Sequence, residues 1–438
     1  MISPPTSKQA AITTAVLERL TSAYGPLDFS IRLWDGSVIP AAAGQPNRFT
    51  MVITRPDALY RMLVPPSKRA AAEAYVNGDL EIEGDFIAGV DVVRTLSRKL
   101  KMSDVAAVVP SILKLKPSSN GNRDLAKPVL PGGRHTKERD KSAIRFHYDI
   151  GTDFYALWLD QRMVYSCSYF PTGQETLDES QERKLDHICR KLRLQHGETF
   201  LDLGCGYGGL VIHAAERYGV QARGITISKA HGELAQQRIR EKGLSDRCRV
   251  DIMDYRELPR DQQFDKIAAI GIIEHVGENR LAEYFELVWS LLKPGSVFLN
   301  HGICWPGTNR TYQRKLDRLP IGKNFIQRHI FPDLDLLPLH TILRSAGRVG
   351  WEVRDVENLR EHYTITLRKW LENLDANWEK AVAEVGEPTA RIFRAYLGYS
   401  SYSFQVGDIN LIHTLFAKPD PYGRVDIPLT REYMYPAP

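Results

Sequence analysis

The chain has 438 residues, of which 43% are hydrophobic and 25% charged, so it is a globular protein long enough for two domains and not a disordered one. Its net charge of +5 is mild, and its 5 scattered cysteines lack C-x-x-C spacing, so we expect neither a disulfide framework nor a metal site. The N-terminus has no signal-peptide core, and no apolar run approaches the ~18–20 residues of a transmembrane helix. We therefore expect a cytoplasmic protein.

Residues 1–95 are predicted to form a small α/β domain. An amphipathic helix over 11–25 precedes strand-like stretches at 30–36 and 48–56. A helix around 57–66 is followed by the segment AAAEAYVNGDLEIEGD (70–85), where a helix gives way to a turn and then to a strand.

Residues 96–145 are rich in Pro, Gly, Ser, Lys and Arg, which predicts a linker that contains a short helix. This linker is the most basic region of the chain, with Lys99, Lys101, Lys114, Lys116, Arg123, Lys127, Arg134, Lys137, Arg139 and Lys141. It is either a solvated tether or a contact with an anionic membrane, where each Lys or Arg is worth ~1 kcal/mol near the lipid. We do not expect nucleic acid as a partner, because aromatic residues are not interleaved with these charges.

From about residue 190 onward, strands and helices alternate, which predicts a doubly wound α/β domain. Strands are expected at 198–206, 222–228, 248–254, 264–277 and 296–303, with helices at 209–219, 229–244 and 281–295. Residues from about 306 to 345 interrupt this alternation. Two antiparallel strands at 351–359 and 409–419 are then expected to complete the sheet.

The loop LDLGCGYGG (201–209) follows the first of these strands and opens a helix. Its glycines fit the G-x-G-x-x-G pattern of dinucleotide sites, but the second strand, ARGITIS, lacks the acidic residue that would bind the ribose of NAD ~20 residues later. Asp202 just before the loop is more typical of S-adenosylmethionine (SAM) sites, and Asp254 after the third strand can accept from an adenine amine. The sequence therefore predicts a SAM site.

Three polar residues are expected at the carboxyl edge of the sheet, where ligands of such folds bind. Glu274 and His275 stand at the end of the fourth expected strand, and His301 stands at the end of the fifth. Each could be a hydrogen-bonded structural residue, but their shared position above a cofactor loop favours a functional role.

Several motifs in one order resemble the cyclopropane-fatty-acyl-phospholipid synthase family, to which the mycolic acid cyclopropane synthases and methyltransferases belong. They are HYDIGTDFYALWLDQRMVYSCSYF (147–170), LDLGCGYGG, GITIS, IEHVG, NHGI and HYTITLRKW (362–370). The resemblance implies a class I SAM-dependent methyltransferase with a seven-stranded, doubly wound, Rossmann-like sheet over 146–438. Residues 72–85 likewise resemble the end of the family's N-terminal lipid-binding domain.

The resemblance implies methyl transfer from SAM to a cis double bond of an acyl chain in a membrane phospholipid. The resulting carbocation then loses a proton to a bound bicarbonate, and a cyclopropane ring closes. The implied catalytic positions are Cys167, Glu274, His301, the backbone of Ile303, and Tyr363. The implied SAM positions are Tyr165, Ser166, Asp202, Gly204, Cys205, Gly206, Thr226, Ile227, His231, Asp254 and Tyr255.

Three positions depart from the family pattern. His231 replaces a common Gln and Tyr255 a frequent Trp, and both keep the capacity to hydrogen-bond or stack. Ser400 stands where many full-length synthases carry a cysteine, outside the implied bicarbonate set.

Other functions fit part of these observations. The same carbocation could yield a methylene-branched chain, which a partner reductase would convert to a methyl branch. A methyltransferase for small soluble molecules would leave the N-terminal domain unexplained, and a non-catalytic lipid-binding protein would not need the intact catalytic set. We further expect a homodimer that associates peripherally with the inner face of an anionic membrane.

Overall fold

The computed structural model describes residues 6–64, 70–117, 132–133, 136–139, 142, 150–307 and 322–435. The chain divides into two compact units. The first unit comprises residues 1–127, 309–330 and 385–402, and the second unit comprises 128–308, 331–384 and 403–438. The predicted boundaries at 95 and 145 stay a prediction, and linker residues 118–131 lie outside the described residues.

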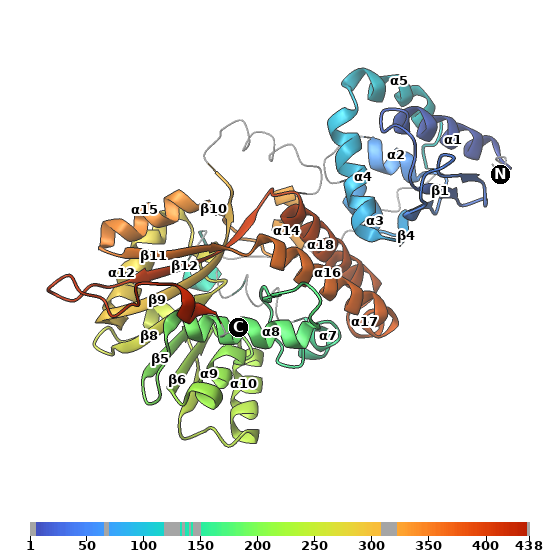
Figure 1. Cartoon of the computed structure of the whole chain (residues 1–438). Helices are drawn as coiled ribbons and strands as arrows, with labels where there is room; N and C mark the ends of the chain where they lie inside the picture. Colours follow the sequence, from blue (N-terminus) through green and yellow to red (C-terminus); the bar gives the residue numbers. More distant parts are fainter. Residues whose placement is uncertain are drawn as a thin grey trace. The chain divides into compact units, whose positions relative to one another are not determined.

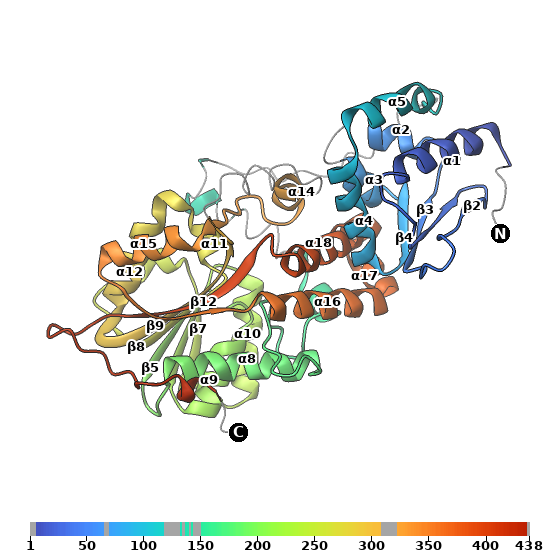
Figure 2. The ribbon, with the colours of Figure 1, turned by 45° about the horizontal axis from the view of Figure 1, so that its top comes forward.

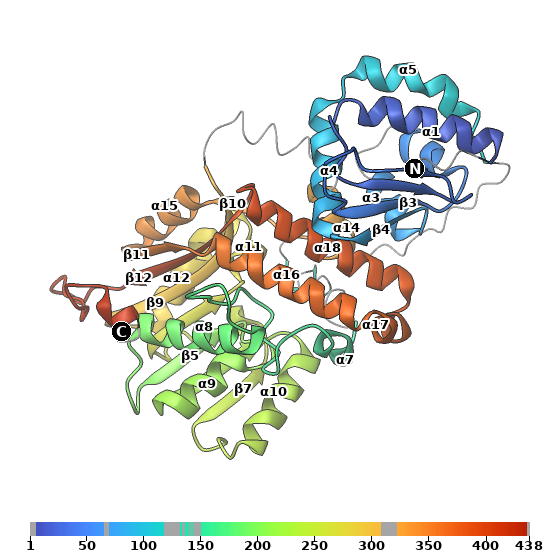
Figure 3. The same ribbon diagram turned by 45° about the vertical axis from the view of Figure 1, so that its right-hand side comes forward.

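The first unit contains a four-stranded sheet in the order β2-β1-β3-β4, in which β1 and β3 are parallel and the other pairs antiparallel. Its strands are β1 (Ser30–Leu33), β2 (Val38–Ile39), β3 (Phe49–Ile53) and β4 (Leu80–Gly84). Its helices are α1 (Lys8–Thr21), α2 (Ala58–Leu63), α3 (Ala70–Val76), α4 (Phe86–Lys99), α5 (Met102–Leu113) and α14 (Gly322–His329). Helices α1 and α5 pack against each other (Figure 3).

Helix α1 begins three residues before the predicted start. Ser7 accepts a hydrogen bond from the Ala10 backbone N–H, so it caps the helix and fixes where it starts. Val16, Leu17 and Leu20 then lie on one buried face, as the amphipathic pattern predicted.

A segment from far along the chain completes the first unit. Residues 387–402 form most of helix α18 (Glu387–Gln405). Arg391 Nη2 and Arg394 Nη1 lie 2.6 and 3.3 Å from the Glu81 carboxylate on β4. Tyr402 donates its hydroxyl proton to Asp91 of α4 at 2.6 Å.

The second unit is built on the sheet β11-β12-β9-β8-β5-β6-β7, with the two-residue β10 beside β9 as an eighth strand. Its strands are β5 (Thr199–Leu203), β6 (Gln221–Thr226), β7 (Cys248–Ile252), β8 (Phe264–Ile270), β9 (Leu292–Trp305), β10 (Leu337–Pro338), β11 (Glu352–Asn358) and β12 (Asn410–Ala417). β12 is antiparallel to both β9 and β11, whereas β9, β8, β5, β6 and β7 are parallel (Figure 1). The predicted doubly wound α/β fold with an antiparallel closing pair is confirmed.

Helices cover both faces of this sheet (Figure 2). On one face lie α8 (Leu177–Leu192), α9 (Gly209–Tyr218) and α10 (Lys229–Glu241), and on the other lie α12 (Leu281–Leu291) and α15 (Leu339–Val349). Each face buries its own apolar cluster, so burial of apolar side chains holds the three layers together. The unit also contains α7 (Thr152–Ala156), α11 (Ile273–Val276), α16 (Arg360–Ala376) and α17 (Trp378–Val385). None of the helices in the described ranges combines the length and the apolar character needed to cross a membrane.

Strand β9 differs from its prediction at both ends. It starts at Leu292, directly after α12, and runs on to Trp305, because β12 pairs with it as far as Cys304 and Pro338 of β10 pairs with Trp305. His301 therefore lies inside the strand and not, as predicted, at its end. Glu274 also lies beyond its strand, in the short helix α11 that follows β8.

Candidate functional site

The carboxyl ends of β5, β6, β7 and β8 open onto one cavity. All of the residues predicted to contact SAM line it, namely Tyr165, Ser166, Asp202, Gly204, Cys205, Gly206, Thr226, Ile227, His231, Asp254 and Tyr255. The cavity lies where doubly wound sheets bind ligands.

The glycine loop forms the close turn from β5 into α9. Gly204 has φ +78°, and a Cβ there would lie 2.2 Å from Ile272 Cδ1, so only glycine fits. The backbone N–H groups of Gly204 and Cys205 both donate to the Ile225 carbonyl on β6, which holds the loop against the neighbouring strand.

Asp202 and Lys184 are buried at this cavity, and sequence analysis had not identified Lys184. Burial raises the pKa of Asp202 to about 7, and its Oδ1 has no hydrogen-bond partner among the described residues. Burial lowers the pKa of Lys184 on α8 to about 8, and its ammonium donates to Ser166 Oγ at 3.0 Å. A buried carboxylate oxygen without a partner at a cavity wall is suited to a cationic ligand such as SAM.

His231 and Asp254 lie on the cavity wall, the first as a neutral ring and the second as a carboxylate paired with an arginine. His231 is buried beside the Tyr207 ring at 4.0 Å between centroids, and burial lowers its pKa to about 4, so its ring is neutral. Burial acts to raise the pKa of Asp254, but hydrogen bonds from Arg256 outweigh it and hold that pKa below its ordinary value. Both carboxylate oxygens of Asp254 accept from Arg256, so the expected bond to adenine stays a prediction.

Glu274 and Ile303, two members of the predicted catalytic set, are joined by a hydrogen bond. Glu274 Oε1 accepts from the Ile303 backbone N–H at 2.7 Å, and Glu274 Oε2 has no hydrogen-bond partner in the described parts of the chain. Burial raises the pKa of Glu274 to about 7. Gly302 makes this approach possible, because a Cβ there would lie 2.2 Å from Ile273 Cγ2 on α11.

The Cys167 thiol and the Tyr363 backbone N–H both hydrogen-bond to the same carbonyl group. The Leu359 carbonyl accepts from the Cys167 thiol at 3.8 Å and from the Tyr363 backbone N–H at 3.0 Å. Burial raises the pKa of the Cys167 thiol, so it stays protonated and is no nucleophile. The Tyr363 ring packs on Phe404 at 4.7 Å between centroids.

His301 shares the strand and the face of Ile303, since they are two residues apart on β9. Its Nδ1 lies 2.8 Å from Nε2 of His413 on β12. Four of the predicted catalytic residues thus form two hydrogen-bonded groups in one unit, one around Glu274 and one around Leu359, and His301 bonds to His413 instead. Their catalytic roles stay predictions.

Comparison with known proteins assigns the family. The family model described as mycolic acid cyclopropane synthetase matches residues 135–414. The chain belongs to this family. A "Probable fatty acid methyltransferase" of Pseudomonas putida is 39% identical over 93% of this chain and 96% of its own length. The cyclopropane-fatty-acyl-phospholipid synthase of Escherichia coli (strain K12) is 35% identical over 62% of this chain and 66% of its own length.

Solved structures of family members share the fold of this synthetase-family chain. The mycolic acid cyclopropane synthase CmaA1 complexed with SAH and CTAB is 30% identical, with a TM-score of 0.60 over 66% of this chain and 99% of that one. The cyclopropane synthase MmaA2 from Mycobacterium tuberculosis is 29% identical, with a TM-score of 0.58 over 64% and 98%. This chain is a SAM-dependent methyltransferase with a class I fold, as the motifs predicted.

The family motifs do not include the polar residues that α8 contributes to the site of this methyltransferase. Gln181 donates to the carbonyls of Val164 and Ser166, and Lys184 donates to the Ser166 hydroxyl. One feature of the sequence could have identified Gln181 and Lys184. They lie on the same helical face as the apolar residues Leu185, Ile188 and Leu192, where polar side chains are unusual.

Proposed function

We propose that this chain transfers the methyl group of SAM to a cis double bond of an unsaturated phospholipid acyl chain, and that loss of a proton then closes a cyclopropane ring. Family membership supports SAM-dependent modification of lipid acyl chains. The observation that carries the finer proposal is the buried Glu274 carboxyl, which has one oxygen without a partner among the described residues and a pKa raised to about 7 by burial. Loss of a proton from a buried carbocation requires such an acceptor or a group that it holds.

The side chains around the cavity have separate tasks in this reaction. An alkene is a weak nucleophile, so it must be held in line with the methyl group of the donor. Tyr165 lines the cavity, and its ring lies 5.2 Å from Trp158 and 5.3 Å from Trp370 between centroids. The electron-rich faces of such an aromatic cluster stabilise a nearby cation and keep water away.

Bicarbonate fits the proposed site as the proton acceptor. Glu274 Oε2 is available to accept the hydroxyl proton of that ion, and His301 and Tyr363 carry groups that donate to its oxygens. The Ile303 N–H is committed to Glu274, so it orients Glu274 and does not itself bind the ion. Bound there, bicarbonate would supply the base for the final step.

Mass spectrometry of the lipid product tests the proposal. Purified protein, SAM, bicarbonate and vesicles of unsaturated phospholipid are expected to give a product heavier by one CH₂, with a ring in place of the double bond. No SAM turnover on any unsaturated vesicle, with or without bicarbonate, would contradict the proposal and favour a non-catalytic lipid-binding protein.

A branched acyl chain is the second candidate product. Relatives that span nearly the whole chain are named as probable fatty acid methyltransferases: the one from Pseudomonas putida, and one from Mycobacterium tuberculosis that is 33% identical over 95% of this chain. An exocyclic alkene in the product would decide for this candidate, which needs a partner reductase to give the methyl branch. Ring closure would decide against it.

We further propose that the protein reaches its substrate by peripheral binding to an anionic membrane through its N-terminal domain and basic linker. Not every linker charge is free for lipid: Arg139 Nε lies 2.7 Å from Asp333, and Lys137 Nζ lies 3.3 Å from Glu257. Activity on vesicles should rise with their anionic lipid content and fall with salt. Insensitivity to both would count against membrane docking. The homodimer and the inner-face location stay predictions.

A further inference from the structure

A row of three polar side chains crosses three neighbouring strands of the second unit. Glu357 on β11 stands directly opposite His413 on β12, and His413 stands directly opposite His301 on β9. Residues paired in this way point to the same face of the sheet. The next residue across is Ile270 on β8, which lines the SAM cavity. The row therefore joins the cavity to the far edge of the sheet.

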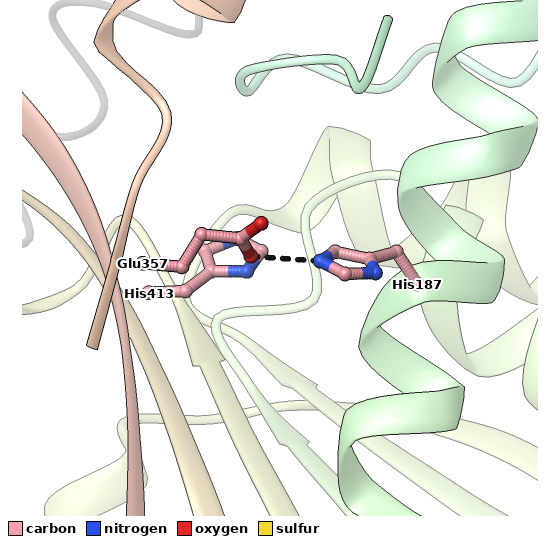
Figure 4. Close-up of side chains that lie close together, drawn as sticks. All are labelled: His187, Glu357 and His413. Atoms are coloured by element: carbon pink, nitrogen blue, oxygen red, sulfur yellow. Dashed lines mark hydrogen bonds and ion pairs between the residues drawn. The ribbon is translucent and has the colours of Figure 1, made fainter. Parts of the chain in front are cut away.

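Helix α8 covers this row with polar groups of its own. His187 Nε2 lies 2.8 Å from Glu357 Oε2 (Figure 4), and the Lys191 ammonium lies 2.7 Å from the same oxygen. Lys191 also donates to Asp355 on β11 at 3.0 Å. Lys191 and His413 are both fully buried, so these contacts form in a site that excludes water.

His187, Glu357 and His413 also offer ligand atoms within 4.8 Å of one another, as a metal site would. A metal ion is disfavoured by charge, because the Lys191 ammonium already supplies a cation to the Glu357 oxygen. A divalent ion would add two positive charges to a buried site whose carboxylates, Glu357 and Asp355, are already neutralised in large part by Lys191 and Arg431.

The rings of His301 and His413 share a single proton between their facing nitrogens. Burial lowers the pKa of both rings well below the ordinary value, and the nearby Lys184 and Lys191 ammonium groups act in the same direction. Both rings are therefore neutral at pH 7, and one nitrogen of the facing pair donates while the other accepts. No hydrogen bond to His301 Nε2 is formed by the described part of the chain.

We propose that His413 is a positioning residue that fixes the orientation and the tautomer of His301, so that His301 Nε2 is presented to the reacting groups. This inference rests on the proposed function, in which His301 contacts the proton acceptor. Glu357 stands opposite His413 and bonds to His187 and Lys191, whereas His413 Nδ1 has no hydrogen-bond partner among the described residues. His413 therefore acts on His301 through the one bond between its Nε2 and His301 Nδ1. In metal sites, removing a group that orients a ligating histidine typically costs ~10–100-fold in activity, and we expect an effect of similar size here.

Three variants separate positioning from folding. His413→Leu removes the partner of His301 Nδ1, whereas His413→Gln keeps a hydrogen-bonding group within reach. His213→Gln is the matched control, because His213 is a buried histidine on α9 outside the row. We expect His413→Leu to lower kcat on unsaturated vesicles at least ~10-fold with an unchanged SAM Kd, and His413→Gln to recover most of that loss. Wild-type kcat in His413→Leu, or equal losses in the Leu and Gln variants, would overturn the inference.

A second readout does not depend on the substrate. In protein labelled with ¹⁵N-histidine, the His301 ring signals are identified by their loss in His301→Gln. We expect one fixed tautomer in the wild type and in His413→Gln, and exchange between tautomers in His413→Leu. Identical His301 signals in all three would overturn the inference. A wild type that shows the fixed tautomer but does not act on lipid would contradict the proposed function alone.

Discussion

Asp202 and Lys184 show how burial prepares a residue for a charged ligand. Burial moves both pKa values toward neutrality, to about 7 for Asp202 and about 8 for Lys184. SAM carries a net positive charge, so it binds best when Asp202 is ionised and Lys184 is neutral. Raising the pH from 6 to 8 ionises Asp202, and SAM affinity should therefore rise by up to ~10-fold, with release of a proton on binding. Calorimetry in buffers of different ionisation enthalpy measures both quantities.

Asp202→Asn should weaken SAM binding at pH 8 and remove most of this pH dependence. Asp251→Asn is the control, since Asp251 on β7 lies outside the cavity and pairs with Arg223. If SAM affinity in Asp202→Asn depends on pH as strongly as in the wild type, ionisation of Asp202 does not control SAM binding.

Cys167 links two parts of the site through hydrogen bonds and not through nucleophilic chemistry. Its sulfur lies 3.2 Å from the Ser168 carbonyl and 3.8 Å from the Leu359 carbonyl, and the Leu359 carbonyl also accepts from the Tyr363 N–H. A serine hydroxyl has a shorter bond to Cβ and would not span the longer of these distances. Cys167→Ser should lower kcat several-fold while the SAM Kd changes little, as steady-state kinetics and calorimetry would measure.

Cys189→Ser is the matched control for this change. Cys189 is a residue of α8 that is fully buried in the apolar cluster between this helix and the sheet. Its replacement should therefore lower stability and leave the kinetics unchanged. Equal losses of turnover and SAM affinity in Cys167→Ser would contradict the proposal that Cys167 serves the reaction and not SAM binding.

At the level of elements, Gly302 determines how closely α11 approaches β9. A Cβ at this position would lie 2.2 Å from Ile273 Cγ2, so Gly302→Ala must push α11 away and lengthen the bond from the Ile303 N–H to Glu274. We expect a loss of ~1–3 kcal/mol in the free energy of unfolding, as for other overpacked sites, and a larger fall in kcat than in SAM affinity. Chemical denaturation and kinetics on the same preparation measure these effects.

Gly347→Ala is the control for the glycine replacement. Gly347 lies inside α15, and beyond the helix's own backbone nothing lies within 4 Å of the position that an alanine methyl group would take. Alanine should therefore leave activity unchanged and stabilise the helix slightly. A wild-type Glu274 environment and full activity in Gly302→Ala would show that the close approach of α11 is not needed.

Elements whose signals are local were predictable from the sequence, and those set by distant partners were not. The βα alternation predicted the doubly wound sheet and the glycine loop predicted a SAM site, because their residues lie in continuous motifs, and the family resemblance implied the remaining residues of the cavity wall. The extension of β9 to Cys304 depends on pairing with β12, more than a hundred residues later, and its last residue, Trp305, pairs with β10. The row from Glu357 to His301 depends on the registers of three strands, which a single sequence does not state.

The polar stripe of α8 illustrates the same limit. Lys184 and Lys191 occupy positions that a helical pattern assigns to the buried face, where a lysine is unfavourable unless paired. Only the structure supplies their partners, Ser166 for Lys184 and the β11 carboxylates for Lys191. A buried lysine at helical spacing therefore marks a polar site that hydrophobic patterning overlooks.

At the level of the whole molecule, the chain returns to its first unit twice, with residues 309–330 and again with residues 385–402. The arginines of α18 that bond to Glu81 are only 11% and 13% exposed, so the Glu81 carboxylate pairs with two largely buried cations. The first unit is therefore incomplete without residues 385–402, and no single cut of the chain separates the two units. Removing the N-terminal residues would leave these arginines without Glu81.

A pair of variants on one strand tests this dependence. Glu81→Gln should lower the free energy of local unfolding of β4 and α18 by ~1–2 kcal/mol, because it removes the carboxylate that Arg391 and Arg394 share at a site only partly open to solvent, although Arg391 keeps its pair with Glu387. Glu83→Gln, two residues along, breaks an exposed ion pair with Arg32 and should cost at most ~1 kcal/mol. Hydrogen exchange of peptides from β4 and α18 measures both. Equal exchange in the two variants would mean that the pairs between Glu81 and the α18 arginines do not stabilise β4 and α18.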